Sequence, residues 1–96
     1  MKTIDFAKFI YDHEVAIFGK EKNIKGQSNG FAYRKQIAAL NLKMNEFINK
    51  NKEKAKDHKY LLGLFAYAIT QFGVTVKTDV DAYKDDFYDL LKEGGL

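Results

Sequence analysis

The amino-acid sequence predicts an all-α protein built as a single-domain four-helix bundle. Its 96 residues are enough for one hydrophobic core but too few for two ordinary domains. Proline is absent, so no segment is barred from forming a long helix. Apolar residues recur at helical spacing between segments that contain glycine. We therefore expect four helices, at about residues 3–18, 31–50, 57–72 and 79–92.

The first expected helix, 3–18, carries two apolar stripes and should end at Gly19. The stripe predicted to face the core consists of Phe6, Phe9, Ile10, His13 and Ile17. The second stripe consists of Ile4, Tyr11, Val15 and Phe18. It either packs against another neighbour in the core or forms a partner-binding surface, and both alternatives remain open.

A polar loop with three glycines, 19–30, leads to the second expected helix, 31–50, which is clearly amphipathic. Its apolar face consists of Tyr33, Ile37, Leu40, Met44, Phe47 and Ile48, and its opposite face is expected to hold Arg34, Asn45 and Asn49. Segment 50–59 lacks apolar periodicity, which indicates a frayed helix end followed by a connector.

The third expected helix, 57–72, is apolar around most of its circumference, so it should be the most buried element. A strip of small residues on it, where another helix could approach closely, consists of Gly63, Ala66 and Thr70. Gly73 is the expected helix end, and the residues Val74 to Lys77 have extended propensity.

The last expected helix, 79–92, buries a face that consists of Val80, Tyr83, Phe87, Leu90 and Leu91. It begins within the segment "TDVDAYKDDFYD", which holds five aspartates in twelve residues. Thr78 is the expected N-cap, with Asp81 three residues on in the pattern of a capping box. Asp79 and Asp81 favour the positive end of the helix dipole.

These aspartates do not form a calcium loop of the EF-hand type. Counted from Asp79, the fifth, sixth and twelfth positions are Tyr83, Lys84 and Leu90, where such a loop needs two oxygen ligands and a glycine. Asp81, Asp85 and Asp89 instead recur every fourth residue on the polar side of the helix. They form either a solvated acidic face or a docking surface for a basic partner.

The residue pattern gives little support for a catalytic site or a metal site. "GQSNG", around the single serine Ser28, matches a nucleophile elbow in letters, but no strand precedes it. His13 and His58 lie 45 positions apart and cysteine is absent, so we expect no zinc site and no disulfide. We predict that the protein is not an enzyme and uses no cofactor.

The net charge of +3 is unevenly distributed along the chain. Residues 1–59 hold 13 Lys and Arg against 7 Asp and Glu, whereas residues 60–96 hold 3 against 6. The basic part suggests an alternative function, nucleic-acid binding. Its candidate residues are Arg34, Lys35, Lys43, Lys50, Lys52, Lys54, Lys56 and Lys59. A solvated linker explains the same lysines, because they alternate with Asn, Glu and Ala along the connector.

From residue 61 onward, "LLGLFAYAITQFGVTVKTDVDAYKDDFYDLLKEGG" resembles the C-terminal part of pediocin-like (class IIa) bacteriocin immunity proteins. The shared pattern is a third helix that runs through a short extended turn into an amphipathic fourth. The resemblance implies four antiparallel helices and a cytosolic, non-enzymatic protein. It also implies protection of the producer from a membrane-permeabilising peptide, through contact with the peptide's sugar-transporter receptor complex.

We therefore expect a protein of the cytoplasm that works by stoichiometric contact with a protein partner. No secretory signal is expected, because charged residues interrupt the apolar pattern of the first fourteen positions. The most apolar run, residues 60–72, spans thirteen residues, against the roughly twenty that a helix needs to cross a bilayer. The partner-binding candidates are Ile4, Tyr11, Val15, Phe18, Asp81, Asp85 and Asp89. Immunity-like self-protection, inhibition of a host or defence protein by a phage product, and homo-oligomerisation all remain open.

Overall fold

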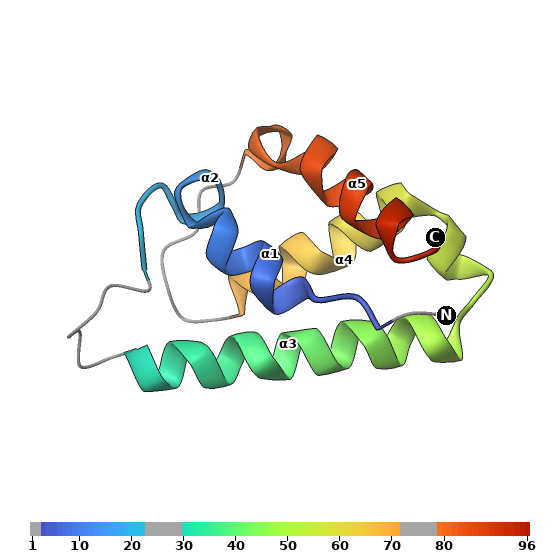
Figure 1. Ribbon diagram of the computed structural model, residues 1–96, viewed down its shortest axis with the longest axis horizontal. Coiled ribbons are helices and arrows are strands. Elements are labelled where there is room, and N and C mark those ends of the chain that lie inside the picture. Colours follow the sequence, from blue (N-terminus) through green and yellow to red (C-terminus); the bar gives the residue numbers. More distant parts are fainter. Residues whose placement is uncertain (1–2, 23–29, 72–78) are drawn as a thin grey trace.

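The computed structural model describes residues 3–22, 30–71 and 79–96, and within them the protein is helical, without strands (Figure 1). The all-α prediction is therefore confirmed for the part of the chain that is described. The elements in chain order are α1 (Phe6–Asp12), α2 (Glu14–Phe18), α3 (Gly30–Lys50), the 3-10 turn η1 (Lys54–Lys56), α4 (His58–Thr70), the 3-10 turn η2 (Val80–Ala82) and α5 (Lys84–Glu93).

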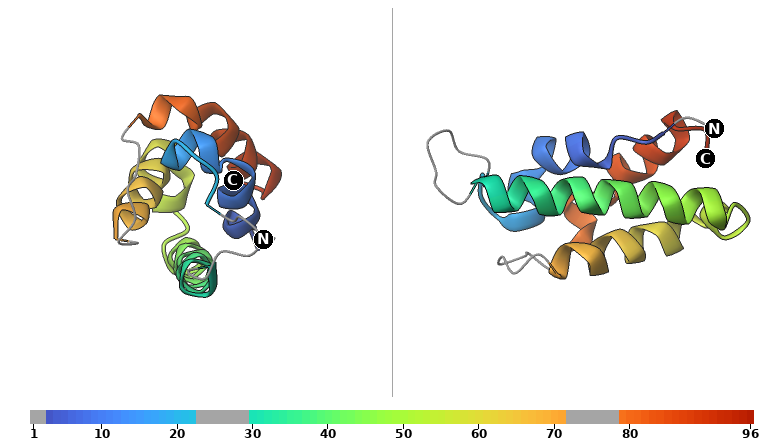
Figure 2. Two further views of the ribbon diagram at one scale, coloured as in Figure 1. Left: turned by 90° about the vertical axis from the view of Figure 1, so that its left-hand side faces the viewer. Right: turned by 90° about the horizontal axis from the view of Figure 1, so that it is seen from below.

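The long helix α3 runs along one side of an elongated molecule measuring 40 × 24 × 21 Å (Figure 1). Viewed end on, α1, α4 and α5 are grouped with α3 around one core (Figure 2). The buried centre is rich in aromatic rings. Phe6, Phe65 and Phe87 are fully buried, and the ring centroids of Phe65 and Phe87 lie 4.8 Å apart.

The expected helix 3–18 is two helices rather than one. Asp5 caps α1, because its side chain accepts a hydrogen bond from the Lys8 N–H at 2.9 Å. The backbone at His13 then leaves helical geometry (φ −122°, ψ 25°), and α2 runs on to Gly19, whose φ of 82° is the left-handed conformation that glycine adopts readily. Because residues 3–5 lie outside the helix and α2 changes direction, the predicted second stripe is not a single face.

The prediction that 31–50 is one helix agrees with α3 to within one residue, and Arg34 and Asn49 of its predicted polar face are exposed, but Asn45 was placed wrongly. Asn45 is buried and faces the segment that precedes α1 instead of solvent. Its side-chain oxygen accepts from the Ile4 N–H at 2.9 Å, and its amide nitrogen donates to the Ile4 carbonyl at 2.8 Å. One turn earlier, the Asn41 oxygen accepts from the N–H groups of Phe6 and Ala7 at 2.7 and 3.3 Å. We call these contacts the polar seam.

The connector between α3 and α4 is more ordered than its composition suggests. Within it, η1 buries Ala55 completely, and Asp57 caps α4 by accepting from the Tyr60 N–H at 3.1 Å. Helix α4 buries Leu61, Phe65 and Ile69, as its apolar pattern predicted. Gly63 in the predicted small-residue strip is exposed, with open space around it.

The last expected helix, 79–92, is also divided. η2 is capped by Asp79, whose side chain accepts from the Asp81 N–H at 3.1 Å, and α5 begins after a break at Tyr83 (φ −136°). Asp79 thus occupies the capping position predicted for Thr78. Thr78, Gly73 and the segment Val74 to Lys77 lie outside the described residues, as does Ser28.

Candidate functional site

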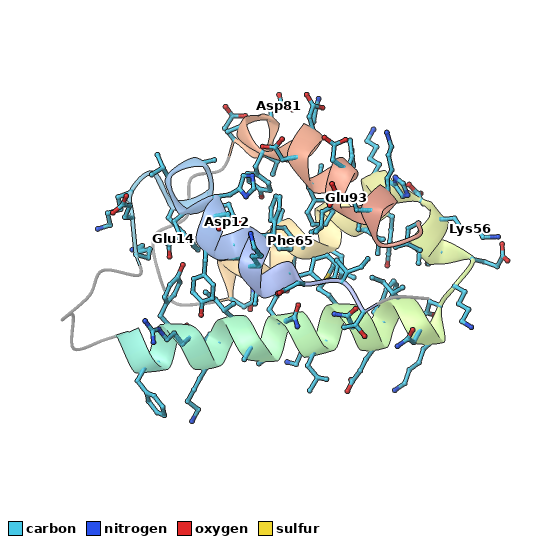
Figure 3. The ribbon with its side chains drawn as sticks, in the orientation of Figure 1. Asp12, Glu14, Lys56, Phe65, Asp81 and Glu93 are labelled. Carbon is cyan, nitrogen blue, oxygen red and sulfur yellow. The ribbon has the colours of Figure 1, made fainter. Side chains whose placement is uncertain are left out.

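An acidic groove lies between α1 and α5, which come from opposite ends of the chain. It is an open hollow of about 600 Å³. Its lining contains five carboxylates, one lysine, His13 and two apolar side chains, Phe9 and Leu90, which form its floor. The lining residues are Asp5, Lys8, Phe9, Asp12, His13, Asp86, Asp89, Leu90 and Glu93. Asp12 and Glu93, labelled in Figure 3, belong to the two helices that flank it.

Helical spacing explains why these carboxylates share a surface. Asp5 and Asp12 precede and end α1 seven positions apart, and Asp86 and Glu93 are likewise seven positions apart on α5. Each pair borders the buried apolar stripe of its own helix. Lys8 is the one cation of the lining, and its hydrogen bond to Asp12 at 2.5 Å raises the pKa of Lys8. The groove therefore keeps a surplus of negative charge at neutral pH.

His13 closes the end of the groove at the joint between α1 and α2. Its ring stacks on Phe9 with centroids 4.1 Å apart. Its Nδ1 lies 2.8 Å from the Phe9 carbonyl oxygen, and its Nε2 lies 3.0 Å from Asp86 Oδ2. The sequence placed His13 in the core-facing stripe of residues 3–18, and the structure adds a hydrogen bond to a carboxylate on α5 that the pattern alone did not indicate.

Glu14 is the one buried carboxylate of the described residues, with 6% of its surface exposed. It accepts a hydrogen bond from the Tyr33 hydroxyl at 2.7 Å and another from the Lys22 N–H at 3.2 Å. Burial, reinforced by the hydrogen bond to Glu14, raises the pKa of Tyr33 well above its usual value. Both polar groups are occupied in joining α2 to α3, so they belong to the framework of the fold.

Of the three aspartates predicted to form one acidic face, only Asp89 lines the groove. Asp81 lies on η2, before the break at Tyr83, and its Oδ1 is 3.2 Å from Lys84 Nζ. Asp85 is exposed on α5 but is not part of the lining. The groove carboxylates that the sequence interpretation missed are Asp5, Asp12, Asp86 and Glu93. They could have been found by matching the acidic edge of α5 with the acidic edge of α1, which requires knowing that these helices are neighbours.

The second apolar stripe is divided between core and surface. Ile4 and Phe18 are buried, with 3% and 5% exposed, so these two are unavailable to a partner. Phe18 packs edge-on against Tyr33, with ring centroids 5.9 Å apart, and Tyr11 is half-buried beside the same ring. Val15 alone is well exposed, at 58%. For most of this stripe, the structure decides between the two alternatives in favour of packing.

The basic candidates are spread over the molecule. Arg34 and Lys35 lie near the start of α3, whereas Lys50 ends it, so about 24 Å of helix separates the two groups at 1.5 Å per residue. Lys35 lies over the ring of Phe31 and Lys54 over that of Tyr60, at 5.5 and 4.9 Å from the ring centroids. The remaining candidates are exposed; they are Lys43, Lys52, Lys56 and Lys59.

A second hollow, of about 650 Å³, lies where the end of α5 approaches the end of α3. Ile48 and Leu96 form its apolar part, and Lys52 and Lys56 stand at its edge. Lys56, labelled in Figure 3, lies 3.4 Å from Glu53, so it is partly engaged. His58 bonds the Leu96 backbone oxygen at 3.0 Å beside this hollow.

No set of three or more metal-ligating side chains comes together among residues 3–22, 30–71 and 79–96. In the same residues, each helix is too short or too polar to traverse a lipid bilayer. No family model, curated protein or solved structure matches the chain. The similarity to bacteriocin immunity proteins therefore stays a prediction.

Proposed function

We propose that this small helical protein acts in the cytoplasm by stoichiometric binding to a protein partner and performs no enzymatic chemistry. The observation that carries the proposal is the acidic groove between α1 and α5. The partner that fits it presents a basic segment, with lysine or arginine side chains opposite the carboxylates and a small apolar group opposite Leu90.

Charge complementarity supports this assignment. The side chains of Asp12 and Asp86 are 51% and 63% exposed, so a cation of the partner can reach them without any rearrangement of the core. Like charges at helical spacing destabilise a helix by a few tenths of a kcal/mol per pair, about 0.2 to 0.5. A basic partner would relieve this repulsion, and complementary charges also accelerate encounter and discriminate against wrong partners.

Two versions of the proposal differ in the identity of the partner. In the first, the protein confers bacteriocin immunity by binding a membrane transporter complex, as the resemblance of residues 61–95 implies. In the second, it is a phage-type inhibitor that occupies a basic site of a host or defence protein. Expression in a strain sensitive to a pediocin-like peptide separates them, because only the first version predicts protection.

Nucleic-acid binding is the second candidate, favoured by the exposed aromatic rings that lie beside lysines. Tyr60 with Lys54 and Phe31 with Lys35 could each stack a base next to a phosphate contact. This function predicts affinity that falls steeply as salt rises, because bound counterions are released from the phosphates.

The first test is a tagged pull-down from bacterial lysate, with and without nuclease, analysed by mass spectrometry and nucleic-acid quantification. The proposal expects a stoichiometric protein that survives nuclease treatment at moderate salt. Co-purifying nucleic acid that disappears with nuclease would instead favour the second candidate.

A matched pair of variants then locates the surface. Asp89→Asn with Glu93→Gln removes two charges from the groove, whereas Asp81→Asn with Asp85→Asn removes two charges outside it. We expect the groove variant to weaken partner binding at least tenfold, by about 1.4 kcal/mol or more, and the outer variant to bind nearly as the wild type. Equal losses in both variants would mean that overall charge, rather than the groove, controls binding.

A further inference from the structure

The ring of His13 can donate both of its hydrogen bonds at once only when both ring nitrogens are protonated. Nδ1 faces a backbone carbonyl oxygen, that of Phe9, at 2.8 Å, and Nε2 faces a carboxylate oxygen, that of Asp86, at 3.0 Å. Both partners accept hydrogen bonds, and neither has a proton to offer. A neutral imidazole carries a single N–H, so one of its nitrogens would present a lone pair to an acceptor.

We propose that His13 is a protonation-dependent latch that ties the joint between α1 and α2 to α5. When both ring nitrogens carry protons, the ring is held flat against Phe9 and bridges to Asp86 across 73 residues of sequence. When one proton leaves, the neutral ring can donate only one of the two hydrogen bonds, and its bare nitrogen faces an acceptor oxygen, so the link to Asp86 is weakened.

The surroundings of the ring make the bridge responsive to that proton. His13 lines two hollows, the acidic groove and a neighbouring one. The charged side chains of the acidic groove are Asp5, Lys8, Asp12, Asp86, Asp89 and Glu93. Those of the neighbouring hollow are Asp12, Glu14, Glu21 and Asp86. Lys8 is the one cation among them and is bonded to Asp12. The carboxylate within hydrogen-bonding distance of Nε2 is Asp86. Histidine is the side chain whose charge changes most readily near neutral pH, so the latch is sensitive to pH.

Opening of the latch has a defined structural result. Phe9 is 5% exposed and carries the His13 ring on one of its faces. Release of the ring uncovers that face at the floor of the acidic groove and removes one positive charge from its lining. The groove thus becomes both more apolar and more acidic as the pH rises. This inference does not depend on the proposed partner, because it concerns a bond within the chain.

The test is a double-mutant cycle of His13 and Asp86, measured as unfolding equilibrium constants at pH 5.5 and pH 8.5. His13→Phe keeps a ring to stack on Phe9 but removes both nitrogens, and Asp86→Asn removes the charge. In the wild-type background we expect Asp86→Asn to raise the unfolding constant about two- to fivefold at pH 5.5. At pH 8.5 the same substitution should change the unfolding constant by less than about 1.5-fold. In the His13→Phe background, Asp86→Asn should change the unfolding constant by the same factor at both pH values.

Asp89→Asn is the matched control, since it makes the same change in the same groove one turn further along α5. His58 is present in every member of the cycle, so its contribution cancels. The proposal is overturned by an Asp86→Asn effect that is equal at both pH values. It is also overturned if the pH difference persists with His13→Phe, or if Asp89→Asn reproduces it.

Discussion

Helix α1 is held on its two sides by different kinds of contact. Toward α4 and α5 it inserts Phe6 and Phe9 into an aromatic cluster with Phe65, Tyr83 and Phe87, where ring centroids lie 4.8 to 6.3 Å apart. Toward α3 it is held by the polar seam, in which Asn41 and Asn45 bind the backbone of residues 4–7. One helix thus connects an apolar interface with a hydrogen-bonded one.

The two interfaces do different work. Apolar burial is proportional to area and nearly independent of direction, so the aromatic cluster supplies stability without choosing one position of α1 along its axis. Hydrogen bonds require donors and acceptors at set positions, so the polar seam aligns residue 4 with Asn45 and residue 6 with Asn41. We infer that the cluster stabilises the fold and the seam sets its register.

The largest loss of stability is expected from Phe65→Ala, because this fully buried ring contacts Phe6, Phe9, Tyr83 and Phe87. Truncation leaves a cavity in the centre of the cluster and should lower the free energy of unfolding by about 3 to 5 kcal/mol. Denaturant unfolding measures it. Tyr67→Ala is the control on the same helix, since Tyr67 is 61% exposed and its truncation should cost less than about 0.5 kcal/mol. Similar losses would show that the cluster is not the main source of stability.

A smaller loss is expected from Asn45→Ala, which removes both partners of the Ile4 backbone at a buried position. Unpaired buried groups should lower the free energy of unfolding by about 2 to 3 kcal/mol. Asn49→Ala, at an exposed position one turn along α3, should be nearly neutral. If the seam sets register, Asn45→Ala should also shift the amide NMR signals of residues 4–7, whereas unchanged signals there would assign the seam a purely energetic role.

Tyr33→Phe tests a hydrogen bond between α2 and α3, outside both interfaces of α1. The buried Glu14 carboxylate would lose the Tyr33 hydroxyl, at a cost of about 2 kcal/mol near neutral pH. Burial, with the bond to Glu14, holds the folded pKa of Tyr33 above the usual 10.0, so the unfolded chain releases this proton first as the pH rises. Stability should therefore be retained below about pH 10 and fall above it. Alkaline unfolding curves should be less steep for Tyr33→Phe, and identical curves would contradict the assignment.

The smallest expected effects have opposite signs at two glycines. A side chain at Gly94 would overlap Ile4, with its Cβ 2.7 Å from Ile4 Cδ1, so Gly94→Ala should push on the end of the polar seam and cost about 1 to 2 kcal/mol. Gly63→Ala on α4 meets open space and should stabilise by about 0.5 to 1 kcal/mol through helix propensity. Thermal unfolding of the pair measures both, and a stabilising Gly94→Ala would show that Ile4 is free to move.

The contrast between the two interfaces also describes what the sequence can predict. Ile37, Leu40 and Met44 were placed on the buried face of 31–50 by the 3.6-residue period, and all three are buried. Asn45 was assigned to the polar face with Arg34 and Asn49, opposite the apolar stripe. Its true partner is the backbone of a residue 41 positions away, and no local pattern carries that information.

The breaks at His13 and Tyr83 were missed for a related reason. Neither glycine nor proline marks them, and tertiary contacts hold them, such as the bond from His13 to Asp86. Of the five carboxylates of the acidic groove, only Asp89 was therefore predicted as a site residue. The density of aspartates in 79–89 was evident, but the break at Tyr83 separates Asp81 from Asp89, and the opposing carboxylates come from α1.

The polar seam also has a consequence for the order of events in folding. Its bonds join residues 34 to 41 positions apart, whereas α3 and α4 are joined by a short connector that contains η1. Closing the longer loop costs more chain entropy, so we expect the α3–α4 hairpin to form before α1 docks. Substitutions in the seam should then accelerate unfolding and leave the refolding rate almost unchanged. The polar seam would form in the last step of folding, so its strength would set the unfolding rate and with it the lifetime of the native state.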